Sequence, residues 1–130
     1  MNFVHQNFHI MATVDFYTIF NNKLQEFIQE LATTFPNISQ FKLFDTVIKT
    51  CVIMDKELPL TTFKRTVEIP FGDSIDKKDE NFILSQSFDE ADQSIVNLLK
   101  LVWKDLADQN KDAVWGHITL LLAISRKVKK

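Results

Sequence analysis

The sequence is poor in glycine, proline and cysteine, and each scarcity excludes a class of protein. Two glycines and three prolines among 130 residues are too few for the frequent tight turns of a β-sandwich or barrel, and too few for a disordered linker. The single cysteine, Cys51, cannot form an intramolecular disulfide, so the fold does not depend on an oxidising compartment. Long helices joined by short loops are the architecture that remains.

Long apolar runs and an excess of one charge are also missing. The longest apolar run, 120–124, is far shorter than the roughly 18 residues that span a bilayer, so we expect no membrane insertion. The net charge is −2, and acidic and basic residues are mixed along the chain. A dedicated nucleic-acid binder usually carries a basic excess on one face, and we therefore expect no nucleic-acid partner.

What the sequence does have is helical periodicity in its first half. Apolar residues recur at steps of three and four over 15–35, which indicates an amphipathic helix that Pro36 ends. The same pattern over 37–54 predicts a second helix. The apolar stripe that we expect to be buried there comprises Phe41, Phe44, Val47, Ile48, Cys51 and Val52. Because the link between the two helices is short, we expect an antiparallel αα-hairpin.

Residues that are able to cap helices set the expected boundaries. Thr13 is placed to cap the first helix, and Asn37 or Ser39 is placed to cap the second. We therefore expect residues 1–12 to form an N-terminal tail and residues 13–130 to form a single helical domain.

The middle of the chain, 55–88, follows no long period. Pro59 is placed to begin a short helix, whereas Pro70 and Gly72 are expected to break the chain into short helices and a surface loop. Alternating residues over 65–71 would also allow a small extended pairing.

Helical periodicity returns in the last part of the chain. The segments 88–107 and 108–130 predict a second αα-hairpin, with the polar residues between Trp103 and Trp115 forming its turn and both tryptophans facing the shared interior. The expected fold is therefore all-α: a single compact bundle of about five helices, built from two αα-hairpins with an irregular middle segment.

The last helix supplies the candidate partner-binding residues. Its apolar residues cover most of its circumference, and a helix that is apolar all round must be enclosed by its own domain or by another chain. Leu120 and Ile124 lie four residues apart, and we expect them on the outer side, in contact with a second copy or a partner protein. Trp115 is expected in the core, and it would belong to a binding site if it were exposed. His117 is expected in the core or at an interface.

Sequence motifs for catalysis are not found. The chain contains no phosphate-binding glycine loop, no nucleophile elbow and no combination of paired cysteines and histidines at zinc-finger spacing. His5 and His9 would share one face of a helix, but no third ligand lies beside them in the sequence. We therefore expect no enzyme activity, no cofactor and no metal site.

The segments FNNKLQEFIQELATTFP, DENFILSQSF, LLKLVWKDL and VWGHITLLLAI carry a resemblance that covers the chain from Phe16 onward. In this order they resemble a group of small proteins encoded by nucleocytoplasmic large DNA viruses of the phycodnavirus and mimivirus type. The resemblance implies a virus-encoded helical protein of the host cytoplasm or the virion, and it transfers no catalytic residue.

The segment VWGHITLLLAI is also similar to the Asn-Trp-Gly-Arg signature region of Bcl-2-type apoptosis regulators. Trp115 and Gly116 match that signature, whereas Val114 and His117 replace its Asn and Arg. The replaced Arg normally pairs with an acidic residue of the bound helix, so the departure falls on a ligand-binding position.

Two interpretations of function follow. The leading one is a non-catalytic helical protein that acts through protein-protein interaction or self-association, as a structural component of a virion or free in the host cytoplasm. The alternative is a regulator that captures a partner helix in an apolar groove, as the second resemblance implies.

Overall fold

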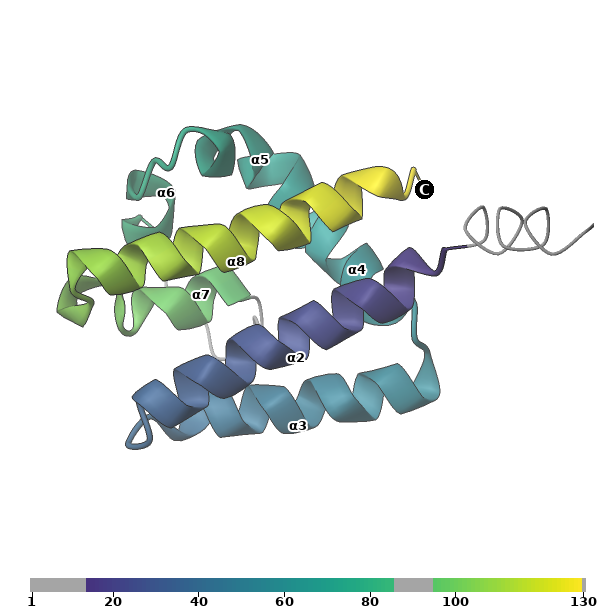
Figure 1. Ribbon diagram of the computed structural model, residues 1–130, viewed down its shortest axis with the longest axis horizontal. Helices are drawn as coiled ribbons and strands as arrows, with labels where there is room; N and C mark the ends of the chain where they lie inside the picture. The colour runs from purple at the N-terminus through teal and green to yellow at the C-terminus, as the bar shows by residue number, and fades with distance from the viewer. Residues whose placement is uncertain (1–13, 86–94, 130) are drawn as a thin grey trace, which may run out of the picture.

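The computed structural model describes residues 14–85 and 95–129. Within these ranges every regular element is helical, which confirms the predicted all-α class. The buried apolar side chains form one cluster between the helices (Figure 1). The predicted tail and the predicted cap Thr13 lie outside the described residues.

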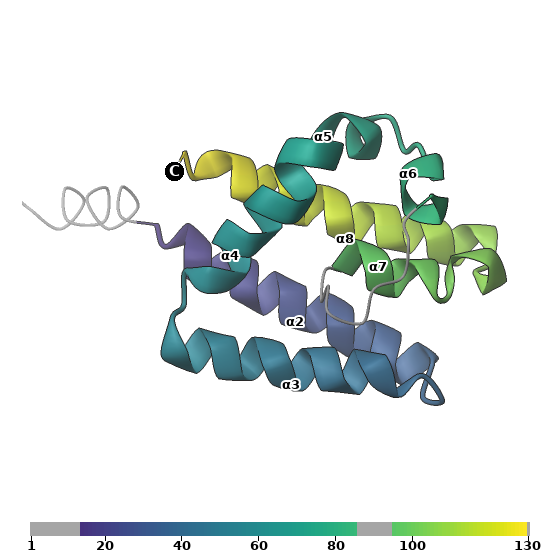
Figure 2. The ribbon, with the colours of Figure 1, turned by 180° about the vertical axis from the view of Figure 1, so that it is seen from behind.

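The first two long helices form the predicted hairpin. Helix α2 spans Phe16–Thr34 and helix α3 spans Ser39–Met54, and they run antiparallel side by side (Figures 1 and 2). The prediction that Pro36 ends the first helix is confirmed. Neither Asn37 nor Ser39 caps α3, because the helix starts after Ile38 without a side-chain hydrogen bond to its first turn.

Asp15 caps α2 and also fixes where the chain enters the domain. Its carboxylate accepts hydrogen bonds from the backbone N–H groups of Tyr17 at 3.1 Å and Thr18 at 3.2 Å. The Lys56 ammonium donates to the same carboxylate at 2.7 Å. This hydrogen bond, followed by those from Thr18, lowers the pKa of Asp15 to about 2. Buried Asn21 donates to the Lys56 carbonyl oxygen at 2.9 Å. The start of α2 is therefore held against the link between α3 and the next helix.

The middle segment contains short helices, as expected, but it is not broken at Pro70 or Gly72. It comprises α4 (Leu58–Phe63), a π-helical turn (Lys64–Glu68), α5 (Ile69–Asp76) and the short α6 (Asn81–Leu84). Pro59 lies in the first turn of α4, as predicted.

The π-helical turn explains why Pro70 does not break the helix. A proline inside a regular helix would clash with the carbonyl group four residues before it. Here the Ile69 N–H reaches back five residues to the Lys64 carbonyl oxygen, so Pro70 sits in the first turn of α5. The predicted extended pairing over 65–71 is therefore wrong.

Gly72 does not break the helix either. It is buried within α5, facing the last helix, α8 (Asp108–Lys127). A β-carbon added at Gly72 would lie 3.1 Å from Arg126 Nη2 and 3.9 Å from Leu122 Cδ1. Gly72 therefore lies at the contact between α5 and α8, where a small side chain would press only on the end of the Arg126 side chain.

The first arm of the second predicted hairpin ends earlier than expected. Helix α7 spans Ile95–Lys100, a 3-10 turn spans Trp103–Asp105, and the chain then extends into α8. The predicted continuous helix to residue 107 is wrong, since tertiary contacts of Trp103 outweigh the local pattern. Its Nε1 donates to Glu80 at 2.6 Å, and its ring meets Trp115 edge-on with centroids 5.3 Å apart. Both tryptophans are buried, as predicted.

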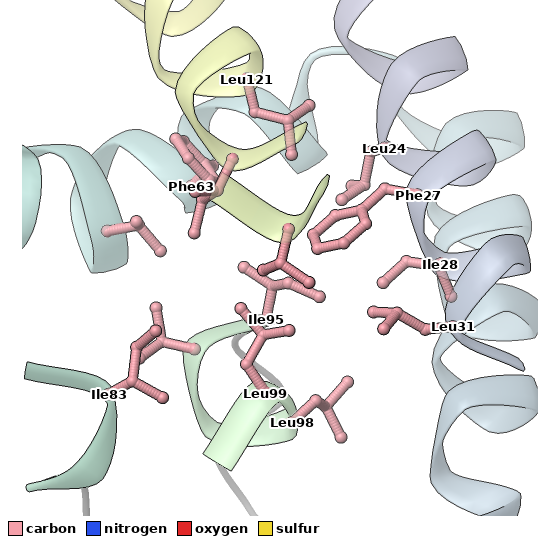
Figure 3. Close-up of a cluster of buried hydrophobic side chains, with 14 of the residues drawn as sticks. Leu24, Phe27, Ile28, Leu31, Phe63, Ile83, Ile95, Leu98, Leu99 and Leu121 are labelled. Atoms are coloured by element: carbon pink, nitrogen blue, oxygen red, sulfur yellow. The ribbon is translucent and has the colours of Figure 1, made fainter. Parts of the chain in front are cut away.

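The core lies where α2, α7 and α8 face one another, with α4 and α6 closing its sides (Figure 3). Leu24, Phe27, Ile28 and Leu31 of α2 point toward Ile95, Leu98 and Leu99 of α7 and Leu121 of α8, with Phe63 and Ile83 at the edge.

We predict that Trp115→Ala lowers the free energy of unfolding by about 3–5 kcal/mol, because it removes a buried ring that packs on Trp103 and Phe82. The control Lys104→Ala changes an exposed side chain and should cost less than about 0.5 kcal/mol. Urea unfolding followed by circular dichroism measures both, and equal small effects would contradict the prediction.

We also predict that Asp15 contributes to stability above its ordinary pKa and loses that contribution in acid. Its folded-state pKa of about 2 lies below the unfolded value of 3.8, so protonation between about pH 5 and pH 2 favours the unfolded chain. The Asp15→Asn variant keeps a capping side chain but loses the ion pair with Lys56. Its melting temperature should fall less than that of the wild type over this range, whereas parallel curves would contradict the prediction.

Candidate functional site

The four residues predicted to bind a partner do not form one exposed surface. Leu120 is 42% exposed, as predicted for the outer side of α8. Ile124 is only 8% exposed and belongs to the core, so the prediction that it lies on the outer side is wrong. The reason is that α8 packs against α2 and also against α4, the π-helical turn and α5, and is thus covered on two sides. Trp115 is 6% exposed and is likewise part of the core.

His117 lies at the interface between α8 and α2. Its ring stacks on Phe27, with centroids 4.8 Å apart and an angle of 14° between the planes. Its Nε2 contacts the Glu30 carboxylate. It borders a polar hollow formed with Glu26, Gln29, Glu30, Thr33 and Thr34. These contacts give His117 a role in joining two helices of the same chain, and its predicted contact with a partner stays a prediction.

An apolar pocket of about 190 Å³ opens on a different part of the molecule. We call it the α3–α4 pocket. It is lined by Leu24, Phe44, Val47, Ile48, Cys51, Leu58, Pro59, Thr62, Phe63, Thr66, Val67 and Ile95. None of these side chains carries a charge at neutral pH, so the pocket favours apolar groups over ions.

The pocket has a buried floor and a solvent-exposed rim. Core side chains such as Phe44 and Phe63 form the floor. Val47 and Cys51 are half-buried on the rim, and Leu58 is 41% exposed. An apolar side chain from outside could therefore reach the floor between α3 and α4.

The apolar surface continues from the rim along α3. Leu43, Val47 and Cys51 are spaced four residues apart, and Met54 follows three residues later, so they form one stripe of the helix. Leu43 is 58% exposed and Met54 is 80% exposed. Adjacent exposed apolar side chains of this size mark interaction surfaces more often than isolated ones do.

The course of α4 and α5 creates the pocket. The chain leaves the end of α3, and α4 then leads away from it toward α5 and α8 (Figure 2). Leu58, at the start of α4, forms part of the rim of the pocket. Thr66 and Val67 of the π-helical turn form part of its wall.

Polar contacts on the opposite side hold that turn against α8. Lys64 Nζ donates to Glu68 at 2.9 Å and to the Ser125 carbonyl oxygen at 2.9 Å, and Ser125 Oγ donates to Glu68 at 2.6 Å. Burial raises the pKa of Glu68, but the hydrogen bonds from Ser125 and Lys64 outweigh it and the pKa is lowered overall. The wall of the pocket is thereby fixed by a charge-assisted network.

Sequence reasoning missed this pocket because it assigned Val47 and Cys51 to the buried stripe of the second helix. The sequence feature that could have indicated the pocket was the width of the apolar face of α3. Leu43, Ile53 and Met54 lie outside the stripe that packs on α2, and they remain exposed. Periodicity shows that such residues share a helix, but it does not show which face finds a partner.

Metal-binding clusters and membrane-spanning helices are two further features that the described residues could carry. Among these residues, no group of three or more His, Cys, Asp or Glu side chains is placed to hold a metal ion. Across 14–85 and 95–129, none of the helices combines the length and the hydropathy needed to cross a membrane. No family model, no curated protein and no solved structure matches the chain.

We predict that Leu120 and Ile124 respond differently to the same substitution. Leu120→Glu places a charge at an exposed position and should change the free energy of unfolding by less than about 0.5 kcal/mol. Ile124→Glu buries a carboxylate in the core and should cost about 3 kcal/mol or more. Chemical denaturation of the two single variants tests this, and a stable Ile124→Glu protein would refute the core assignment.

Proposed function

We propose that the protein is a non-catalytic protein-protein interaction protein that binds an amphipathic helix of a partner through the α3–α4 pocket. The observation that carries this proposal is the pocket itself, whose lining is uncharged and whose rim continues into an exposed apolar stripe on α3.

The size of the pocket favours a protein segment over a small molecule. Small-molecule sites commonly measure roughly 300–1,000 Å³, whereas this pocket measures about 190 Å³. That space suits one or two apolar side chains from a larger partner. The rest of the contact would then lie outside the pocket, on Leu43, Met54 and Leu58.

The shape of the exposed stripe favours a helix as the binding segment. Helices that bind in grooves present anchor residues at spacings of i, i+3, i+4 and i+7. Such a ligand could insert one anchor between Val47 and Leu58 and place its neighbours along α3. The chemistry required of the partner is an apolar face without charge, because a charged anchor would lose its hydration in the pocket.

This mode of binding shares the helix-capture principle of the Bcl-2-type resemblance but uses other residues. Trp115 and His117 lie in the core and at the α2–α8 interface, and neither lines the α3–α4 pocket. The proposal therefore rests on the pocket and not on the signature.

The proposed biological setting rests on the resemblance to proteins of large DNA viruses. We propose a virus-encoded protein that serves as a virion component or acts in the host cytoplasm. Mass spectrometry of purified particles tests the first setting, for which a stoichiometric amount of the protein is expected.

We predict that a fluorescein-labelled amphipathic peptide of about 18 residues, with leucine at i, i+3, i+4 and i+7 and no charge on that face, binds the full chain. The Val47→Glu variant places a carboxylate on the rim of the pocket and should weaken binding at least about tenfold. Thr46→Glu adds the same charge one residue earlier, at an exposed position outside the lining, and should leave binding unchanged. Fluorescence anisotropy measures all three proteins, and equal affinities or no binding would contradict the proposal.

A further inference from the structure

We propose that the partner helix at the α3–α4 pocket is α3 of a second copy of this chain, so that two copies form an antiparallel dimer through their α3 helices. This inference rests on the proposed function, because it names the partner for the same pocket and the same exposed stripe. Each copy would supply the apolar helix face that covers the pocket rim of the other.

Helix α3 has the residue spacing of a helix that pairs with another helix. Leu43, Val47, Thr50 and Met54 follow one another at steps of four, three and four, which is the spacing of the seam in a coiled coil. We call these four residues the α3 seam. Leu43, Thr50 and Met54 are exposed, and Val47 is half-buried on the pocket rim. The described part of the chain therefore leaves the seam largely uncovered.

The one polar residue of the seam does not oppose burial. The Thr50 hydroxyl donates to the Thr46 carbonyl oxygen at 3.0 Å, within the same helix. Its hydrogen-bonding need is thus met before any partner arrives, and its methyl group is available for apolar contact.

The seam is symmetric about its midpoint, which makes it complementary to itself. In a second copy that runs antiparallel, Met54 lies opposite Leu43 and Thr50 lies opposite Val47, and a twofold axis repeats both contacts. Each end of the seam then places a large apolar side chain against another, and the β-branched side chains meet at its centre. Antiparallel pairing also sets the positive end of each helix dipole beside the negative end of the other.

Charge does not oppose the pairing either. The charged side chains of α3 are Lys42, Asp45 and Lys49, and none of them holds a seam position. Asp45 and Lys49 form an ion pair at 2.9 Å on their own helix. Because the lining of the neighbouring pocket is uncharged as well, a second copy could cover the seam without burying an unpaired charge.

The exposed apolar area suits a weak dimer. Four apolar side chains on and beside the seam keep between 41% and 86% of their surface in water: Leu43, Ile53, Met54 and Leu58. A side chain of this size buries roughly 60–120 Å², so two copies would bury roughly 500–1,000 Å² through these residues alone. Specific interfaces begin near roughly 1,000–1,200 Å². We therefore expect a reversible dimer that dissociates on dilution.

Sedimentation velocity of the full chain, from about 1 to about 300 µM, tests the inference. The wild type should change from monomer to dimer over this range. Leu43→Glu should weaken dimerisation at least about tenfold, because it brings a carboxylate into the interface from each copy. The matched control Leu120→Glu changes another exposed leucine, on α8, and should dimerise as the wild type does. Circular dichroism confirms that the variants are folded.

The double variant Leu43→Glu/Met54→Lys tests the antiparallel register. Opposite charges would then face one another at both ends of the seam, so this variant should dimerise more tightly than Leu43→Glu. A parallel pairing would instead place like charges together. Dimerisation no tighter than that of Leu43→Glu would overturn the proposed arrangement.

Two further results would overturn the inference: a wild type that stays monomeric over the whole range, and a dimer that Leu120→Glu disrupts but Leu43→Glu does not. The fluorescein-labelled amphipathic peptide separates this inference from the proposed function. Peptide binding by a protein that stays monomeric would contradict the dimer alone. A dimer that neither binds the peptide nor dissociates in its presence would support self-association and contradict the capture of other helices.

Discussion

The structure depends on enclosing α8, a helix whose apolar side chains point in most directions. Burial of apolar area is the main favourable term in folding, so such a helix must be covered on more than one side. Helix α2 covers one side, and the segment from α4 to α5 covers another, where Gly72 of α5 faces α8. This arrangement puts α2 and α4 in contact with α8 and leaves α3 in an outer layer, with its apolar stripe uncovered (Figure 1).

Polar contacts determine how that outer layer is placed. The ion pair between Asp15 and Lys56 joins the beginning of α2 to the end of α3, while the Lys64, Glu68 and Ser125 network holds the π-helical turn on α8. Exposed pairs contribute little to stability, but partly buried, charge-assisted ones fix geometry. The two sets lie at either end of α4, and the partly buried one fixes the π-helical turn that forms one wall of the pocket.

The extent of sequence-based prediction follows from which interactions are local. The hairpin of α2 and α3 could be predicted because periodicity and Pro36 act within a few residues. The continuation of the helix through Pro70 could not be predicted. It depends on the hydrogen bond from the Ile69 N–H to the Lys64 carbonyl oxygen five residues before it, and Lys64 is bound to Ser125, which is distant in the sequence. The same limit explains the candidate site. Leu120 and Ile124 are both apolar and lie four residues apart on α8, so the sequence pattern does not separate them. Only the packing of α5 and α2 on α8 leaves Leu120 exposed and buries Ile124.

The position of the pocket at a junction of helices has a consequence for binding. Its floor belongs to the central core through Leu24, Phe63 and Ile95, so the floor is built from closely packed side chains. Its rim belongs to α3 and the first turn of α4, where Leu58 and Met54 keep much of their surface in water. A closely packed floor reduces the ordering cost of association, and an exposed apolar rim supplies the area that binding removes from water. The uncovered face of α3 thus follows from the enclosure of α8, and it supplies the apolar surface on which the proposed binding of a partner helix rests.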